Sequence, residues 1–395
     1  MTMARKLGPF VSWLALFGCV ATNTGNPSIT SSTGGPDAPG ITSSIGGPHA
    51  PEGIERVRSS LERDIEPSVA DTELGRFSAD GRDFALDLYA QLAAADGNLF
   101  VSPYSVRVAL SMTYAGAEGE TEAEMRNALR FSLPEPDLYA AFNATDLALS
   151  NRSNELGVEQ DFETSTREPA TGDLELRVVN AAFTQKDVEL KQPFLDTLTV
   201  HYDTGMFLAD FFHRPEQERV AINQWVEEQT ETRIQELLPA DSIHIGTVLV
   251  LVNAVYFKGS WLEPFDPART AEEIFHAPSG DVTVSMINGS AEQYTRGDGY
   301  QALELPYIAP AVRMLFILPD EGRFQEIEGA LDRAAFDRIR DELRKYSVTI
   351  KVPKFSFDYQ VRLREVMEAL GMRRAFSEMD ADFSDITTDL LLYVD

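Results

Sequence analysis

The chain contains little cysteine and histidine, and this scarcity excludes several kinds of site. One cysteine in 395 residues cannot form an intramolecular disulfide, a four-cysteine zinc site or a CxxC redox centre. The five histidines show neither HExxH nor HxxxH spacing, so a histidine-rich metal centre is not expected. We therefore expect no metal and no other cofactor.

Basic residues are scarce relative to acidic ones. There are 34 Lys and Arg against 63 Asp and Glu, which gives a net charge of −29. Such a surface repels phosphate backbones, so we expect no nucleic-acid partner.

The common enzymatic motifs are absent as well. The sequence has no GxSxG elbow, no GxGxxG after a strand, no P-loop and no EF-hand loop. A cell-envelope hydrolase is disfavoured because no nucleophile motif exists. We expect a protein that is not an enzyme.

Long hydrophobic runs are missing apart from a short one near the N-terminus. Two basic residues precede an apolar stretch at 7–17 that is too short for a permanent transmembrane helix. The tetrapeptide Leu-Phe-Gly-Cys at 16–19 resembles a bacterial lipobox, which implies cleavage before Cys19 and lipid attachment to that residue. The alternative is an ordinary secretory signal with an incidental cysteine. We expect an exported protein, lipid-anchored to the bacterial cell envelope through Cys19 or extracellular.

Composition divides the chain into four segments. Residues 1–18 are interpreted as a lipoprotein-type signal peptide, and residues 19–53 as a flexible Ser/Gly/Pro-rich tether with a tandem 12-residue repeat at 29–40 and 41–52. Residues 54–76 read as a charged linker or a marginal helix. The folded domain is predicted to extend from 77 to 395.

The folded region mixes helical and strand patterns. Ala85, Leu88, Tyr89 and Leu92 share one helix face, Ser102 before Pro103 reads as an N-cap, and 121–124 reads as a capping box. The continuous apolar run at 247–257 predicts a central strand. Other strands are predicted at 99–101, 174–183, 281–287, 300–307, 312–318 and 348–357. Other helices are predicted at 194–201, 216–238, 363–370 and, as a pair, within 324–343, with an exposed loop at 151–173. Without βαβ regularity, the predicted class is α+β.

Eight segments in order resemble one known family, the serpins. The most specific is Leu251-Val-Asn-Ala-Val-Tyr-Phe-Lys-Gly-Ser-Trp261. The other segments lie at 98–105, 115–125, 223–234, 303–307, 314–319, 352–355 and 381–384. The resemblance covers 77–395 and implies a serpin fold with a large mixed main sheet, smaller sheets and about eight to nine helices.

The resemblance implies protease inhibition by a conformational change. In that family, a protease cleaves an exposed bait loop, which then inserts as a new strand into the main sheet. The implied partner is a protease of the serine or cysteine class, and we expect a monomer. The alternative is a non-inhibitory serpin-fold protein that serves as a binding or chaperone-like module of the envelope.

Four residues match the family's moving parts. Ser102, Ser105 and Asn253 match a gate of small polar groups that controls opening of the main sheet. Trp261 matches the aromatic residue where the loop first enters the sheet. The alternatives remain that Asn253 is a hydrogen-bonded core residue with no switching role and that Trp261 is a large core aromatic.

In serpins, a further strand, a hinge, the bait loop and the final strands follow the segment that matches 381–386. By resemblance, we expect a chain truncated before that strand, which would lie between 247–257 and 348–357. No reactive-centre residue is therefore assigned.

Overall fold

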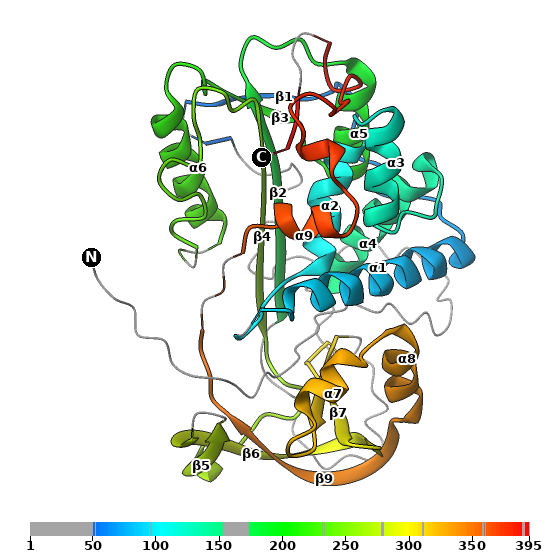
Figure 1. Ribbon diagram of the computed structural model, residues 1–395, viewed down its shortest axis with the longest axis vertical. Helices are drawn as coiled ribbons and strands as arrows, with labels where there is room; N and C mark the ends of the chain where they lie inside the picture. Colours follow the sequence, from blue (N-terminus) through cyan, green and yellow to red (C-terminus); the bar gives the residue numbers. More distant parts are fainter. Residues whose placement is uncertain are drawn as a thin grey trace, which may run out of the picture.

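The computed structural model describes residues 50–152, 174–388 and 392–394, except 52, 96, 231, 233, 278–279, 310–311, 358 and 360. The predicted signal peptide, Cys19, most of the tether and nearly all of the expected loop at 151–173 lie outside the described residues. Figure 1 shows a main sheet with helices on both faces and a second sheet at the opposite end of the molecule.

The main sheet has four strands in the order β1-β3-β2-β4. These are β1 (Glu55–Val57), β3 (Met206–Ala209), β2 (Leu174–Gln185) and β4 (Leu249–Gly259). The two longest strands, β2 and β4, are antiparallel over eleven residue pairs. Within the described residues, β4 pairs with β2 alone, so its other edge carries no strand.

The second sheet has five strands, and β6 is its centre. The strands are β5 (Ala271–Ala277), β6 (Gly280–Gly297), β7 (Tyr300–Pro306), β8 (Arg313–Pro319) and β9 (Arg344–Pro353). Strand β6 pairs with β5 and β7 and also with β9, with a bulge between Ala291 and Gln293. The short helix η1 (Pro267–Arg269) precedes β5.

The helices flank these sheets. They are α1 (Asp71–Leu92), α2 (Pro103–Tyr114), α3 (Gly119–Ala128), α4 (Glu135–Arg152), α5 (Gln192–Tyr202), α6 (Pro215–Gln229), α7 (Phe324–Gly329), α8 (Arg333–Glu342), α9 (Arg364–Ala369) and the short η2 (Arg374–Phe376). One βαβ unit, β2-α5-β3, has parallel strands, and the other strand pairs of the two sheets are antiparallel. The predicted α+β class is therefore confirmed.

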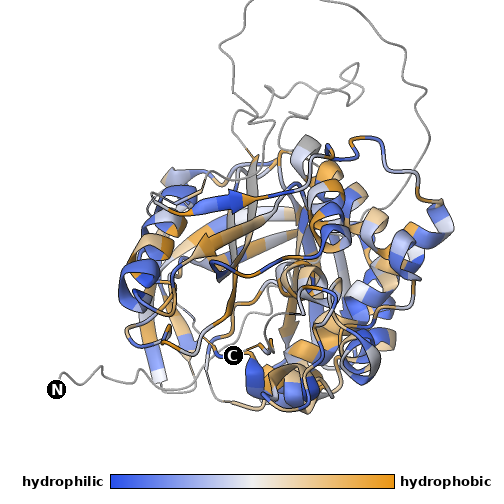
Figure 2. Cartoon of the chain, turned by 90° about the horizontal axis from the view of Figure 1, so that it is seen from above, coloured by the Kyte–Doolittle hydropathy of each residue, from blue (hydrophilic) through white to orange (hydrophobic). Residues whose placement is uncertain are grey.

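Side-chain alternation along the main-sheet strands divides the core into two layers. Ala182 of β2 faces α1–α5, whereas Phe183 faces α6. On the α6 side, Phe183 stacks on Phe207 at a ring-centroid distance of 5.0 Å, and Trp225 of α6 meets both rings. Figure 2 shows the hydrophobic residues on the strands and on the helix surfaces that cover them.

Two predicted features near α2 and α3 are wrong. No strand forms at 99–101, and the side chain of Phe100 is 55% exposed. The predicted capping box does not open α3, which begins at Gly119 after Glu118. Instead, Thr121 accepts a hydrogen bond from the Asp382 backbone N–H, and Glu124 accepts from two backbone N–H groups at 373 and 374. These side chains therefore bind the C-terminal segment rather than their own helix.

Two other elements end earlier than predicted. The helix predicted to reach residue 238 ends at Gln229, because the Asn223 side chain holds Leu238 through its backbone N–H and its carbonyl. The segment after α6 thus folds back on the helix. The strand predicted to reach residue 357 ends at Pro353, which has no N–H to continue a ladder.

The structure also differs from expectation at 54–76. This stretch contains β1 and the first turn of α1, and Ile54 is buried. Charged residues dominate its composition, but the backbone pairs with β3 and an apolar residue anchors it.

Candidate functional site: the sheet-opening region

Ser102 and Ser105 lie at the start of α2, as the sequence predicts. Ser102 is the N-cap, and its hydroxyl accepts a hydrogen bond from the Ser105 N–H at 3.4 Å. The two hydroxyl oxygens are 2.8 Å apart and share a further hydrogen bond. Ser105 is only 1% exposed, and α2 packs against both β2 and β4. Ser105 is therefore buried in a helix that packs against β2 and β4, whereas Ser102 is half-buried.

Asn253 lies in the middle of β4, opposite Asn180 of β2. Its strand packs on the helix that carries the two serines. The structure thus brings the elements of the predicted gate together. A direct bridge between Asn253 and the serines stays a prediction.

Trp261 follows the end of β4 within an aromatic cluster. Its ring stacks on Tyr307 at 4.4 Å and meets the edge of Phe265 at 6.1 Å. Burial raises the pKa of the Tyr307 hydroxyl. A Cβ at Gly259 would come within 2.6 Å of the Tyr307 ring, so glycine is required for this close approach. Trp261 is half-buried and packs in this cluster just after the strand, as the core-aromatic interpretation expects, whereas its role in loop entry stays a prediction.

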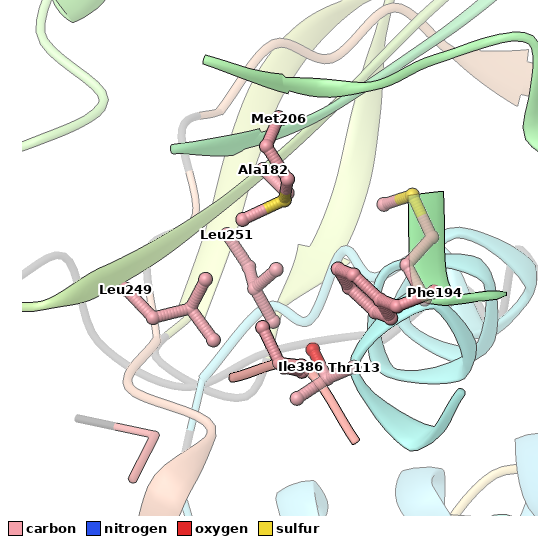
Figure 3. A pocket seen from close by; sticks show the side chains of 8 residues that line it. Thr113, Ala182, Phe194, Met206, Leu249, Leu251 and Ile386 are labelled. Carbon is pink, nitrogen blue, oxygen red and sulfur yellow. The ribbon is translucent and has the colours of Figure 1, made fainter. Parts of the chain in front are cut away.

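A small apolar pocket lies behind the main sheet, between α2, α5 and the strands (Figure 3). Leu249 and Leu251 of β4 line it, together with Ile386 from the C-terminal segment. Thr113 also lines the pocket, and its buried hydroxyl has no hydrogen-bond partner among the described residues.

Sequence reasoning missed the contact that closes this pocket. Ile386 rests on Gly116, where a Cβ would lie only 2.1 Å from the isoleucine Cγ1. Its carbonyl accepts a hydrogen bond from the Lys191 N–H, and the Lys191 ammonium pairs with Asp385 at 2.9 Å. The hydrogen bond from the Lys191 ammonium lowers the pKa of the Asp385 carboxyl. A hydrogen bond between the Glu118 and Asp385 side chains raises the pKa of Glu118. The available signal in the sequence was Gly116, which we interpreted only as the end of a helix.

The described residues contain no group of three or more His, Cys, Asp or Glu side chains arranged to hold a metal ion. In the same part of the chain, every helix is too short or too polar to cross a membrane.

The protein-family model described as Serpin (serine protease inhibitor) matches residues 79–395. The chain belongs to the serpin family. The predicted serpin fold is confirmed, and serpins in general are protease inhibitors rather than enzymes.

Individual relatives agree with this assignment. An uncharacterized serpin-like protein of Thermococcus kodakarensis is 37% identical over 305 residues, which cover 77% of this chain and 67% of the relative. Alpha-1-antitrypsin of Meriones unguiculatus is 30% identical, with 85% of this chain and 79% of the relative covered.

Two solved structures show the same fold. The thermophilic serpin tengpin in its native state has a TM-score of 0.72 at 24% identity, with 87% of this chain and 83% of that chain covered. A cleaved serpin 42Da has a TM-score of 0.69 at 27% identity, with 80% and 81% covered.

Proposed function

We propose that this serpin inhibits serine proteases, or cysteine proteases, by bait-loop cleavage and insertion of the loop into the main sheet. The observation that carries the proposal is the serpin family model, which matches residues 79–395. Strand β4 contributes apolar residues to the core layers on both sides of the main sheet, as a central strand does. In this proposal, the loop inserts into the sheet that contains β4.

The energetics favour insertion of an additional strand into a sheet. Each backbone hydrogen bond formed with an inserted strand contributes about 1 kcal/mol net, so several bonds add up to a large driving force. In this proposal, Ser102, Ser105 and Asn253 regulate the opening of the sheet, and Trp261 lies where the loop enters. No reactive-centre residue is assigned in this chain.

The test is formation of a covalent complex by the complete protein. We expect a complex that survives SDS with at least one of a panel of trypsin-, chymotrypsin-, elastase- and subtilisin-like proteases. The matched control is the same protease with its catalytic serine blocked, which cannot form the acyl-enzyme. Loop cleavage without a complex across the panel would contradict inhibition and favour a binding or chaperone-like envelope protein.

We further propose that the protein is exported and anchored to the cell envelope through lipid on Cys19. The lipobox-like tetrapeptide and the low-complexity tether that follows it support this proposal. Several acyl chains hold a protein firmly at a membrane, whereas one holds it only marginally. We expect Cys19→Ala to move the protein from the membrane fraction to the soluble fraction, with Ser28→Ala in the tether as the control. Equal membrane retention of both variants would exclude the anchor.

A further inference from the structure

The segment at 54–66, called the strap below, runs from the main sheet to the helices behind it. Its first part is β1, which pairs with β3 from Glu55↔Leu208 to Val57↔Met206. Ile54, 7% exposed, packs in the core layer on the α6 side. A Cβ at Gly205 would lie 2.2 Å from the Val57 carbonyl oxygen, so the strap passes directly over a glycine.

The strap continues along the C-terminal turn of α5 and satisfies polar groups there. The Ser59 N–H donates to the Thr199 hydroxyl at 3.1 Å, and the Asp64 N–H donates to the Val200 carbonyl at 3.1 Å. Carbonyls in the last turn of a helix lack partners within the helix, so the strap acts as a cap for α5. Asn143 of α4 is fully buried and donates to the Asp64 carbonyl at 2.6 Å, which ties the strap to a second helix.

His201, the residue after this capped carbonyl, holds a buried ring nitrogen. Its Nδ1 has no hydrogen-bond partner among the described residues, and neither has the Oη of Tyr139, a residue 6% exposed. The two rings are 6.0 Å apart. Both ring nitrogens of a protonated histidine must donate a hydrogen bond, so protonation would leave a buried Nδ1–H unsatisfied. In agreement, burial lowers the pKa of His201, and Asp64 opposes this effect only in part.

Four charged groups on the strap and the surrounding elements form two ion pairs. Arg63 of the strap binds Asp146 of α4 at 2.6 Å, and Arg58 of the strap lies 3.5 Å from Asp203, which follows α5. Asp196 of α5 accepts from Ser59 and Gln192, and these hydrogen bonds lower its pKa. Asp196 therefore titrates below the range in which a histidine does, and Asp64 is the carboxylate that acts on His201.

We propose that the strap is an acid-releasable attachment of the N-terminal segment to α4 and α5, and that protonation of His201 releases it. The sign follows from linkage. A histidine whose pKa is lower in the closed state favours closure when it is neutral. The contribution of neutral His201 to the stability of the attached strap is complete above the ordinary histidine pKa of about 6.5. It is lost progressively as the pH falls below that value. Release would free the edge of β3 and uncover the site of Ile54. This inference does not depend on protease inhibition.

Hydrogen exchange on the full chain tests the proposal, with rates corrected for the intrinsic effect of pH. The reporters are peptides that contain the amides of Ser59 and Asp64, and the reference is the β7–β8 ladder in the second sheet. We expect the strap amides to lose up to about tenfold protection between pH 7.5 and pH 5.5, which is the maximum that one histidine supplies. We expect the reference ladder to stay unchanged.

Three variants decide the role of His201. His201→Phe keeps an aromatic ring but cannot be protonated, so its strap should show no such pH response. Tyr139→Phe removes the neighbouring unpartnered hydroxyl and should retain the response. His276→Gln removes a histidine whose side chain is 81% exposed and should behave like the unaltered protein. A wild-type response in His201→Phe, no response in the unaltered protein, or equal loss of protection in β7–β8 would overturn the proposal.

Discussion

Strand β4 of the main sheet and the β5–β6 hairpin of the second sheet are buried in opposite ways. The faces of β4 are covered, with Val252 1% exposed on the α6 side and Leu249 8% exposed on the α2 side, while one edge has no partner strand among the described residues. Strand β6 has partners along both edges, yet Ile274 and Val282 of the hairpin are 58% and 43% exposed. Burial of the faces and pairing of the edges are therefore separate properties of a strand. Strand β4 combines covered faces with one unpaired edge, and β6 combines two paired edges with partly exposed faces.

The largest effect is expected when the same substitution is made on a covered face of β4 and on an exposed face of β6. Val252→Asp places a carboxylate in the core without a partner, and we expect a loss of at least about 4 kcal/mol in the free energy of unfolding. Val282→Asp leaves the carboxylate in water, and we expect a change below about 1 kcal/mol. Urea denaturation monitored by tryptophan fluorescence measures both. Similar losses in the two variants would mean that the hairpin is as well packed as β4.

A smaller effect is expected behind β4. Ser105→Ala removes a buried hydroxyl that bonds to the half-buried Ser102 and leaves the Ser102 hydroxyl with one partner fewer. We expect a loss of about 1–3 kcal/mol. The control is Ser290→Ala on the exposed surface of β6, for which we expect a change within about 0.5 kcal/mol. A Ser105→Ala variant as stable as the control would show that the serine pair has no role in holding the sheet.

Sequence patterns predicted most of the elements because burial along one element is a local, periodic property. The spacing of Leu88 and Leu92 found α1, and Ser102 with Pro103 found the start of α2. The unbroken apolar run found β4, whose two faces are both covered. The resemblance added what periodicity cannot supply, namely that these elements belong to a serpin.

Contacts between distant segments were beyond sequence reasoning. Arg107, within α2, is 2% exposed, and its guanidinium lies over the rings of Phe77, Phe131 and Phe142 at 4.9–5.6 Å. Burial lowers the pKa of Arg107 to about 10. An arginine in a helix normally faces solvent, so no local pattern predicts this position. The sequence predicted Ser102 and Ser105 of the site. It did not predict the contact between Ile386 and Gly116, because these residues are 270 positions apart in the chain.

The contact between the two sheet regions gives the next prediction. The Tyr89 hydroxyl of α1 donates to the Glu328 carboxylate of α7, and Tyr89 is 7% exposed. We expect Tyr89→Phe to lower the free energy of unfolding by about 1.5 kcal/mol, because a hydrogen bond to a charged acceptor is lost. Tyr294→Phe is the matched control, since its hydroxyl donates to the neutral Gln301 at 2.8 Å. An equal or larger loss in the control would show that the link between the two regions contributes little.

The smallest effect is expected from an ion pair at the same contact. The Arg333 guanidinium of α8 lies 2.9 Å from the Asp83 carboxylate of α1, but its side chain is 51% exposed. Water and salt screen such a pair, and ordering two long side chains offsets much of the attraction. We expect Arg333→Gln to change the free energy of unfolding by less than about 0.5 kcal/mol at 0.15 M salt. The measurement is urea denaturation at low and at high salt, where the difference between variant and unaltered protein should shrink further. A loss above 1 kcal/mol that persists at high salt would mean that this ion pair, rather than the buried Tyr89 and Leu86, holds the second sheet against α1.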